Sequence, residues 1–246
     1  MSQDDLVRVG GVGTGRIFQW AHLRPYPELW RKARLVAFHD LNPDRAREAR
    51  DKYAVLLEEY AAAHPEAAEE IEQNLAQLTC CDSLEEILDR VDVVDVCTHS
   101  RGRMAVAMAA FEKGVHCMVE KPMARTWIEA DRAARACADH PDVLFQLNDD
   151  NAFDPKYHAY RDLIRQGAIG KVQHVTLIRG SGTDATTVLK SQASALDNGG
   201  GCLMDYGSHG IAGIWSVLGL NMQPVRVEAV KIGVRFPHRV LEGEPV

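Results

Sequence analysis

The chain has 246 residues, of which 46% are hydrophobic and 26% are charged, and this composition describes a globular chain long enough for two small domains. The formal net charge of -7 and the lack of a Lys/Arg-rich run argue against nucleic acid or an anionic membrane as the main partner. No stretch reaches the roughly 20 apolar residues of a membrane span, and the start MSQDD lacks the pattern of a signal peptide. We therefore expect a cytoplasmic protein that acts on a small molecule.

The first part of the chain alternates short apolar runs with helical patterns, as in a parallel sheet covered by helices. Ser83 and Glu86 form a capping box, Gly114 suits the end of a helix over 104–113, and Thr126 suits the start of one over 127–138. The expected strands are LVRVGGV, ARLVAFHD, VDVVDVCT, VHCMVEK and DVLFQLN. This pattern predicts an α/β fold with a Rossmann-type doubly wound parallel sheet, in a domain over residues 1–146.

The stretch LLEEYAAAHPEAAEEIEQNLAQL departs from this rhythm, because it is rich in Ala, Glu and Leu and is interrupted at His64-Pro65. We interpret it as an inserted helical hairpin near 54–79. Its expected role is packing or an oligomer contact rather than chemistry.

The turn after the first expected strand reads GGVGTGRIF. A G-x-G-x-x-G pattern that starts at Gly11 meets Arg16 in place of its last glycine, and one that starts at Gly13 meets Phe18. The glycines still let the backbone approach a pyrophosphate, and the N–H groups at a helix start offset its charge. The turn therefore indicates a nucleotide site, although the motif is incomplete in both frames.

Asp40 closes the second expected strand in VAFHDLNP. This is roughly the separation expected for a carboxylate that binds the adenosine ribose hydroxyls, and such a carboxylate repels a 2'-phosphate. The position favours NAD over NADP. The alternative is a plain helix cap, because Asn42-Pro43 also resembles a helix start.

The stretch VEKPM ends an apolar run on two charges and a proline. Ligands bind such sheets beyond the carboxyl ends of the strands, which places Lys121 over the nucleotide crevice. Pro122 stops the strand and restricts the lysine's backbone, so a cation is held where a hydroxyl or carbonyl could meet a nicotinamide. The alternative is a strand end with two solvated charges. The Lys-Pro peptide bond can be cis or trans.

The stretch NGGGCLMDYGSHGIAGIWSVLG predicts a tight turn and then a helix. Asp205 and His209 are four residues apart, so a helix places both on one face, and an imidazole with an acidic partner is a good general base toward an alcohol. The alternative is a core histidine with Asp205 as an N-cap. The helix is expected to pack through Leu203, Ile211, Ile214, Trp215 and Leu218.

Neither the cysteines nor the histidines indicate a metal. The six cysteines include no CxxC pair, and the ten histidines include no HExxH motif. Cys80 and Cys81 are adjacent, which places them poorly for bridging each other. We expect reduced thiols, most of them in the core, and no metal site.

The ordered set GTGRIF, HDLNP, EKPMA and NGGGCLMDYGSHG resembles the Gfo/Idh/MocA family of oxidoreductases, from about Val7 to the C-terminus. The resemblance implies a Rossmann domain followed, over residues 147–246, by an α+β domain with an open, mostly antiparallel sheet, through which a homo-oligomer is expected. It also implies NAD- or NADP-dependent oxidation or reduction of sugars, polyols and related hydroxyl compounds. Lys121 matches the family's active-site lysine, and Asp205 and His209 match its catalytic carboxylate and histidine.

On this resemblance, two sets of residues are expected to bind ligands. The cofactor set is Gly11, Gly13, Thr14, Gly15, Arg16, Ile17, Asp40, Thr98, His99, Glu120 and Lys121. The substrate set is Lys121, Asn148, Asp149, Asp205 and His209.

Some residues depart from the family pattern. In CTHSRGRM, His99 stands at the place of a proline and Arg103 near that of a histidine, so the nicotinamide side of the pocket is expected to differ. Phe18 replaces a small residue and is expected to crowd the helix against the sheet or the nucleotide. The acceptors in QLNDDNAFDP, from Asn148 to Asn151, suit sugar hydroxyls and suit a solvated turn equally well.

The chain also stops soon after the histidine helix. We expect VRVEAVKIGVRF to form one strand of the second sheet, and a sheet with so few strands would expose an edge and an apolar face. The second sheet is therefore expected to be incomplete, either through truncation or because a partner or a second copy completes it.

The expected reaction is hydride transfer between NAD and a carbinol carbon. His209 would take the hydroxyl proton, Lys121 would hold the same oxygen, and Asp205 would orient His209 or bind a neighbouring hydroxyl. Two alternatives use the same scaffold. One is NAD-dependent glycoside cleavage, in which no NADH accumulates, and the other is a non-catalytic sugar or nucleotide sensor.

Overall fold

The structure is a computed structural model that describes residues 6–178, 201–219, 225, 226 and 228. The chain divides into two compact units, Met1–Asn148 and Asp149–Val246, which we call the N-terminal and the C-terminal unit. Among the described residues, no helix is both long and apolar enough to cross a membrane.

A six-stranded parallel sheet forms the centre of the N-terminal unit, with the strand order β3-β2-β1-β4-β5-β6. The strands are β1 (Val7–Val12), β2 (Ala33–His39), β3 (Thr79–Cys80), β4 (Val93–Val96), β5 (His116–Glu120) and β6 (Phe145–Asn148). The order reverses between β1 and β4, and ligands bind such sheets at this point, beyond the carboxyl ends of the strands. The predicted Rossmann-type sheet is confirmed. The short edge strand β3 was not predicted, because two residues carry no periodic signal.

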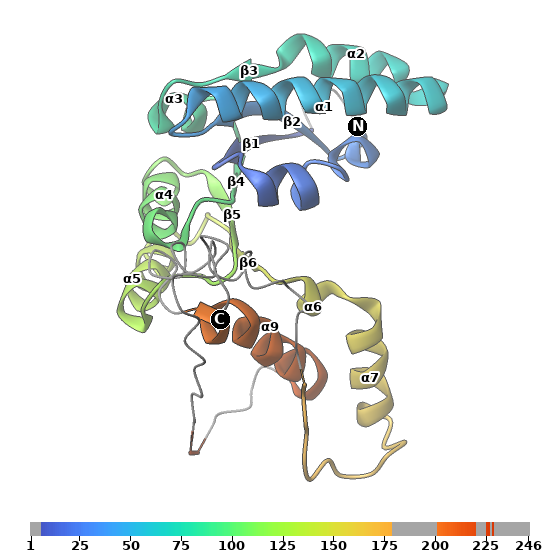
Figure 1. The fold of residues 1–246 in the computed structure, drawn as a ribbon, viewed down its shortest axis with the longest axis vertical. Coiled ribbons are helices and arrows are strands. Elements are labelled where there is room, and N and C mark those ends of the chain that lie inside the picture. The colour runs from blue at the N-terminus through green and yellow to red at the C-terminus, as the bar shows by residue number, and fades with distance from the viewer. Residues whose placement is uncertain (1–5, 179–200, 220–224, 227, 229–246) are drawn as a thin grey trace, which may run out of the picture. The chain divides into compact units, whose positions relative to one another are not determined.

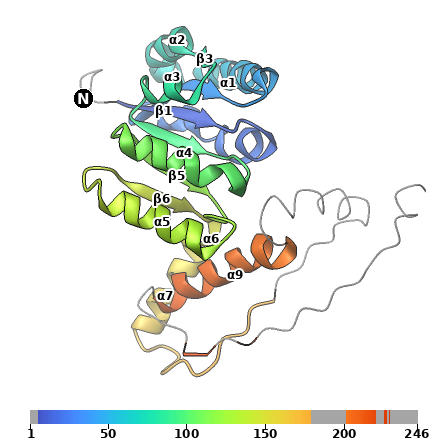
Figure 2. The same cartoon turned by 90° about the vertical axis from the view of Figure 1, so that its left-hand side faces the viewer.

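Helices cover both faces of this sheet, which makes it doubly wound. One buried cluster joins the sheet to α3, α4 and α5, and a second joins it to η2, η3, α1 and α2. Figure 1 shows α1 and α2 side by side next to β2 and β3, and Figure 2 shows α4 and α5 along the same face of the sheet. The helices are η2 (Phe18–His22, a π-helix), η3 (Tyr26–Leu29), α1 (Pro43–Ala63), η4 (Pro65–Ala67), α2 (Ala68–Gln77), α3 (Leu84–Leu88), α4 (Ser100–Glu112) and α5 (Trp127–Ala138).

The helix ends follow the local signals in the sequence. The side chain of Thr126 accepts a hydrogen bond from the Glu129 N–H at 3.3 Å, and α5 has the predicted bounds. Ser83 Oγ accepts from the Glu86 N–H at 3.1 Å, as predicted for a cap of α3. Gly114 has a φ of +69° just after α4. Helix α4 begins at Ser100, four residues earlier than predicted. The polar residues SRGR form its first turn, ahead of the apolar residues from which the helix was predicted.

The predicted helical hairpin is formed by α1 and α2, with the break at His64 and Pro65 as expected. Its first helix differs from the prediction, because α1 begins at Pro43. Asn42 accepts a hydrogen bond from the Asp44 N–H at 3.0 Å and so caps one continuous helix that runs to Ala63. The stretch is therefore the crossover from β2 to β3, not an addition after a separate helix.

The described part of the C-terminal unit contains α6 (Asp150–Phe153), α7 (Pro155–Arg165) and α9 (Gly201–Leu218). The predicted helix around His209 is confirmed. Ile211 and Trp215 are 51% and 41% exposed, so these two positions do not pack as predicted within the described residues. Residues 172–178 have no regular secondary structure. The predicted strand VRVEAVKIGVRF and the incompleteness of a second sheet lie almost entirely outside the described residues.

Candidate active-site residues

The turn after β1 contains two glycines with different surroundings. Gly13 has a φ of +80°, and a Cβ atom there would lie 2.6 Å from the backbone nitrogen of Thr98. A side chain at Gly13 would therefore clash with the turn after β4. At Gly15, nothing lies within 4 Å of a Cβ position, so open space adjoins the backbone. This combination of a tight turn and an open approach fits a pyrophosphate against the backbone.

Phe18 does not crowd the nucleotide turn in the way that the sequence suggested. Its ring is fully buried and belongs to the cluster that contains α1. A Cβ atom at Gly11 would overlap this ring, so Gly11 provides the space that Phe18 occupies. The crowding is relieved by the glycine in the strand, and Gly11 has a packing role within the described structure.

Asp40 directly follows β2, at the same edge of the sheet as the glycine turn. Its Oδ1 accepts a hydrogen bond from the Asn42 N–H at 2.9 Å. The helix cap of α1 is Asn42, so the alternative interpretation of Asp40 as that cap is wrong. A carboxylate held at the end of the second strand retains the placement expected of a ribose ligand.

The remaining residues of the predicted cofactor set differ in exposure. Thr14 is fully buried, and the described structure gives neither its hydroxyl nor that of Thr98 a hydrogen-bond partner. Arg16, Ile17 and His99 are exposed. Gln19, which the sequence analysis did not consider, donates a hydrogen bond from Nε2 to the Thr14 carbonyl at 3.1 Å and so stabilises the turn.

Lys121 follows the last residue of β5, and its peptide bond to Pro122 is cis. Arg103 is 4% exposed and donates to the carbonyl oxygens of Pro122 and Thr98, the latter at 2.5 Å. Burial lowers the pKa of Arg103 to about 10, although the charge of Glu120 acts in the opposite direction. Arg103 is thus directed at two backbone turns and not into a ligand pocket.

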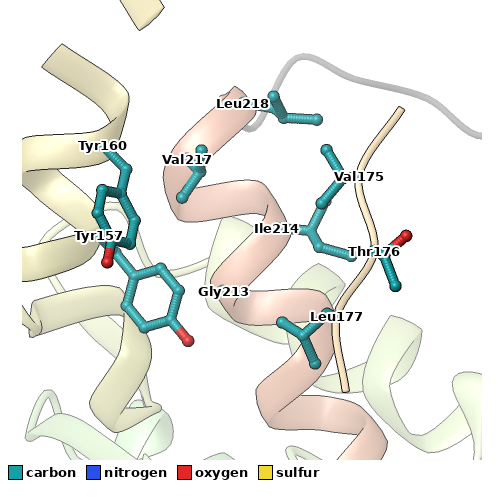
Figure 3. A pocket seen from close by; sticks show the side chains of 9 residues that line it. All are labelled: Tyr157, Tyr160, Val175, Thr176, Leu177, Gly213, Ile214, Val217 and Leu218. Carbon is teal, nitrogen blue, oxygen red and sulfur yellow. The ribbon is translucent and has the colours of Figure 1, made fainter. Parts of the chain in front are cut away.

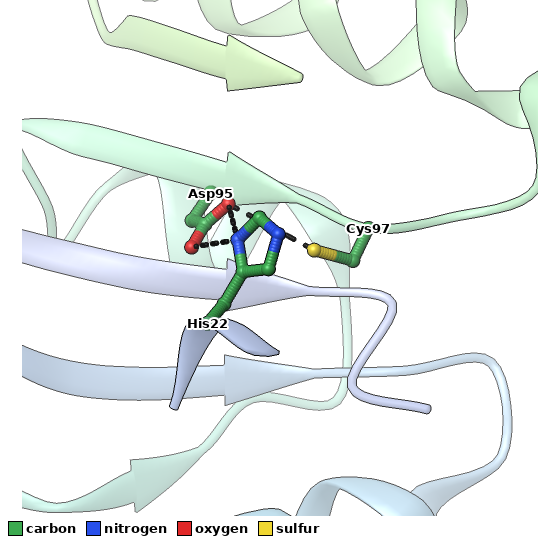
Figure 4. Close-up of side chains that lie close together, drawn as sticks. All are labelled: His22, Asp95 and Cys97. Carbon is green, nitrogen blue, oxygen red and sulfur yellow. Dashed lines mark hydrogen bonds and ion pairs between the residues drawn. The ribbon is translucent and has the colours of Figure 1, made fainter. Parts of the chain in front are cut away.

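His22 contacts Glu120, the residue before Lys121, and the sequence analysis did not predict this contact. Its Nε2 lies 3.0 Å from Glu120 Oε1, and its Nδ1 lies 3.0 Å from both carboxylate oxygens of Asp95. Figure 4 shows the ring between Asp95 and Cys97. Burial alone would lower the pKa of His22, but hydrogen bonds with Asp95, Cys97 and Glu120 raise it above its ordinary value.

In the C-terminal unit, His209 faces two carboxylates. Its Nδ1 lies 3.0 Å from Asp149 Oδ2 and 2.9 Å from Asp150 Oδ1. No hydrogen bond is assigned to Nδ1 among the described residues, so these are close contacts between the ring and two carboxylates. Burial would raise the pKa of Asp149, but the interaction with His209 keeps it below its ordinary value. The ligand-type atoms of these three residues all lie within 4.8 Å of one another.

The stretch after β6 is partly buried and leads into α6. Asp149 and Asn151 are 6% and 4% exposed. Asp149 caps α6 by accepting from the Asn151 N–H at 3.0 Å. Asn148 is the last residue of β6 and accepts from Gln146 Nε2 at 2.9 Å. In α9, the Ser208 hydroxyl donates to the Asp205 carbonyl at 3.0 Å.

The C-terminal unit also contains an apolar pocket of about 200 Å³. Figure 3 shows that side chains from α7, from residues 175–177 and from α9 line it. Its lining is aliphatic and aromatic, with hydroxyl groups as its polar side-chain atoms, and it contains no carboxylate, imidazole or amine.

Comparisons with known proteins agree with the fold. The family profile described as "Oxidoreductase family, NAD-binding Rossmann fold" matches residues 7–148, and the Gfo/Idh/MocA C-terminal domain profile matches residues 157–237. Inositol 2-dehydrogenase from Burkholderia cenocepacia is 28% identical over 166 residues, which cover 67% of this chain and 43% of the relative. Levoglucosan dehydrogenase from Pseudarthrobacter phenanthrenivorans is 28% identical over 153 residues, which cover 61% of this chain and 39% of the relative.

A solved structure of levoglucosan dehydrogenase in complex with NADH and levoglucosan superimposes with a TM-score of 0.66 at 21% identity, over 87% of this chain and 54% of that one. This likeness concerns the fold. The chain spans less than half the length of the two curated relatives above. The N-terminal profile alone covers more than half of the chain, and together with the C-terminal profile it shows that the chain belongs to the Gfo/Idh/MocA family of oxidoreductases with an NAD-binding Rossmann fold.

Proposed function

We propose that this chain belongs to an NAD-dependent dehydrogenase that acts on a hydroxyl group of a sugar, a polyol or a related compound. The observation that carries the proposal is the His209 ring, whose Nδ1 lies within 3.0 Å of two carboxylates. Such a ring is set up for proton transfer at its other nitrogen. The relatives are dehydrogenases of inositol and levoglucosan, which are hydroxyl compounds of this class.

His209 would act as the general base. The carboxylates of Asp149 and Asp150 favour the tautomer with the proton on Nδ1, which leaves the lone pair of Nε2 free to accept a proton from a hydroxyl. The negative charges also stabilise the imidazolium that forms. Asp205 is assigned from the family motif to a neighbouring hydroxyl or to His209.

Lys121 would hold the reacting oxygen. Its ammonium group stabilises the negative charge that develops on the oxygen as the proton leaves. The lysine directly follows β5, at the carboxyl edge of the parallel sheet where this fold binds ligands. Asn148 and Asp149, around the end of β6, are assigned to further substrate hydroxyls.

The residues that would hold the cofactor surround the turn after β1. Gly13, Thr14 and Gly15 would present backbone N–H groups to the pyrophosphate, with Arg16 and Ile17 beside them. Asp40 would accept hydrogen bonds from the ribose and disfavour a 2'-phosphate, which selects NAD. Thr98, His99 and Glu120 follow or end neighbouring strands at the same edge. When bound, NAD supplies the hydride acceptor of the reaction.

The test is the appearance of NADH when the protein is mixed with NAD and a panel of inositols, sugars and sugar acids. A substrate is expected to give NADH with the wild-type protein and at least about a hundredfold less with His209→Gln, which lacks the base. His158→Gln is the matched control, because His158 contacts the Ala152 carbonyl at 2.8 Å in the same unit.

Equal activity of His209→Gln and wild type would reject the assigned base. Binding of NAD without turnover of any compound would favour a sensor, and glycoside release without NADH would favour the glycoside-cleaving alternative.

A further inference from the structure

Buried basic side chains contact the residues on both sides of Lys121. The preceding residue, Glu120, lies 3.0 Å from His22 Nε2 through its carboxylate. The following residue, Pro122, accepts a hydrogen bond on its carbonyl oxygen from Arg103. The side chains of His22 and Arg103 are both largely buried; His22 belongs to η2, far from β5 in the sequence, and Arg103 to α4, the helix that precedes β5. Lys121 therefore lies between two residues, Glu120 and Pro122, that are each held by a side chain from another element.

The alternation of the strands brings these groups together. Val94 and Val96 point into the cluster that contains α4, so Asp95 between them points to the opposite face, where Tyr26 and His22 lie. Asp95 is 2% exposed and accepts a hydrogen bond from the Tyr26 hydroxyl at 2.9 Å. Cys117 and Val119 likewise point into the first cluster, which leaves Glu120 on the face of Asp95.

The charges in this cluster balance. With carboxylates against both ring nitrogens, His22 carries two N–H donors and a positive charge. Arg103 supplies a second positive charge, and Asp95 and Glu120 supply two negative ones. Removal of one member leaves an uncompensated buried charge in the cluster.

A metal site made of His22, Asp95 and Cys97 fits these contacts less well. Their ligand-type atoms lie within 4.8 Å of one another. However, the two ring nitrogens face carboxylates on opposite sides at hydrogen-bond distance, so an ion on either nitrogen would displace one carboxylate. Burial, with the charge of Asp95, also raises the pKa of the Cys97 thiol to about 12, which disfavours the thiolate that a metal needs.

We propose that His22 and Arg103 are positioning residues that hold Lys121 in place at the end of β5, His22 through Glu120 and Arg103 through Pro122. The catalytic meaning of this positioning rests on the proposed function, in which Lys121 holds the reacting oxygen. The positioning is a property of the folded chain and can be measured without turnover.

The first measurement is hydrogen exchange of the full chain, followed by peptide mass spectrometry. In His22→Gln, which keeps a polar side chain but removes the charge, exchange over residues 120–123 is expected to be about tenfold faster than in wild type. Exchange over β1 is expected to stay unchanged. The matched control is His116→Gln, because His116 begins the same strand and accepts from the Leu144 N–H at 3.1 Å. Unchanged exchange over 120–123, or an equal increase over the whole sheet, would overturn the proposal.

The second measurement is the rate of acetylation of the Lys121 amine, with Lys113 and Lys156 as internal references. The ratio of the Lys121 rate to the reference rates is expected to change by about threefold or more in His22→Gln and to stay at the wild-type value in His116→Gln. An unchanged ratio in His22→Gln would contradict the proposal.

Two further measurements test the proposal if the His22→Gln protein does not fold. Arg103→Lys keeps the charge but loses the two-pronged contact with Thr98 and Pro122, and it is expected to speed exchange over 120–123 as well. In ¹⁵N spectra of the wild-type protein at pH 7.5, both ring nitrogens of His22 are expected to be protonated, and a neutral ring would overturn the proposal. A wild-type protein that forms no NADH would count against the proposed function alone, since none of these readouts needs turnover.

Discussion

Asn151 donates a hydrogen bond from its side-chain amide to the backbone carbonyl of His209, at 2.7 Å. This bond ties the corner after β6 to the middle of α9. Asp149 and Asp150, which lie against the His209 ring, belong to the same corner. One side chain therefore sets the backbone of the proposed base relative to its carboxylate partners.

Asn151→Ala is expected to lower the free energy of unfolding by about 1–3 kcal/mol, because Asn151 is 4% exposed and its loss removes a buried hydrogen bond to the His209 carbonyl. Urea denaturation monitored in the C-terminal unit measures the change. Gln173→Ala is the control, since this exposed amide also donates to a backbone carbonyl, that of Lys171, at 3.3 Å. A loss in Gln173→Ala as large as that in Asn151→Ala would contradict the assigned role.

The pair of Asp149 and His209 is expected to make stability depend on pH. Contact with His209 keeps the folded-state pKa of Asp149 below its ordinary value, so the stabilisation is present above about pH 4 and is lost as the pH falls through the folded-state pKa. Asp149→Asn should therefore be less stable than wild type at pH 6, with a difference that shrinks toward pH 3.

Denaturation at a series of pH values measures this difference. Asp150→Asn is the matched control, because the Asp150 side chain is 73% exposed and its contact is screened by water. A difference for Asp149→Asn that stays constant from pH 6 to pH 3 would show that the carboxylate charge does not contribute.

Gly13 and Gly15 are expected to respond differently to the same substitution. Gly13→Ala places a Cβ atom 2.6 Å from the Thr98 nitrogen at a positive φ, so it should cost about 1–3 kcal/mol of stability. Gly15→Ala meets open space and should change stability by less than about 0.5 kcal/mol. If a pyrophosphate approaches this backbone, Gly15→Ala should nevertheless weaken NAD binding by about tenfold or more.

Thermal unfolding and calorimetric titration with NAD separate the two effects. Wild-type affinity in a folded Gly15→Ala protein would place the pyrophosphate elsewhere.

Asp40→Asn is expected to shift cofactor preference toward NADP by about tenfold, because it removes a negative charge from the proposed ribose site. The amide oxygen can still accept the hydrogen bond from the Asn42 N–H, so the turn before α1 should persist. Titration with NAD and NADP gives the ratio of dissociation constants. Asp44→Asn, which changes an exposed carboxylate in the first turn of α1, should leave the ratio unchanged.

Much of the N-terminal unit could be read from local patterns. Thr126, Ser83 and Gly114 mark helix ends because a cap satisfies groups only a few residues away. Lys121 could be placed at the carboxyl edge because every strand of a parallel sheet ends at the same side. The helix around His209 followed from periodicity, although the partners of its ring did not.

The partners of the buried polar groups depended on the tertiary structure. Asp205 was the expected neighbour of His209 from helical spacing, whereas Asp149 and Asp150, about 60 residues earlier in the chain, lie against its Nδ1. His22 meets Asp95 and Glu120 across 73 and 98 residues of sequence. A strand pattern shows that Asp95 alternates with buried valines, but it does not show which distant side chain will satisfy a buried charge. That choice is made when the elements pack, because a charge removed from water must find its counter-charge among the groups that the fold brings within about 3 Å.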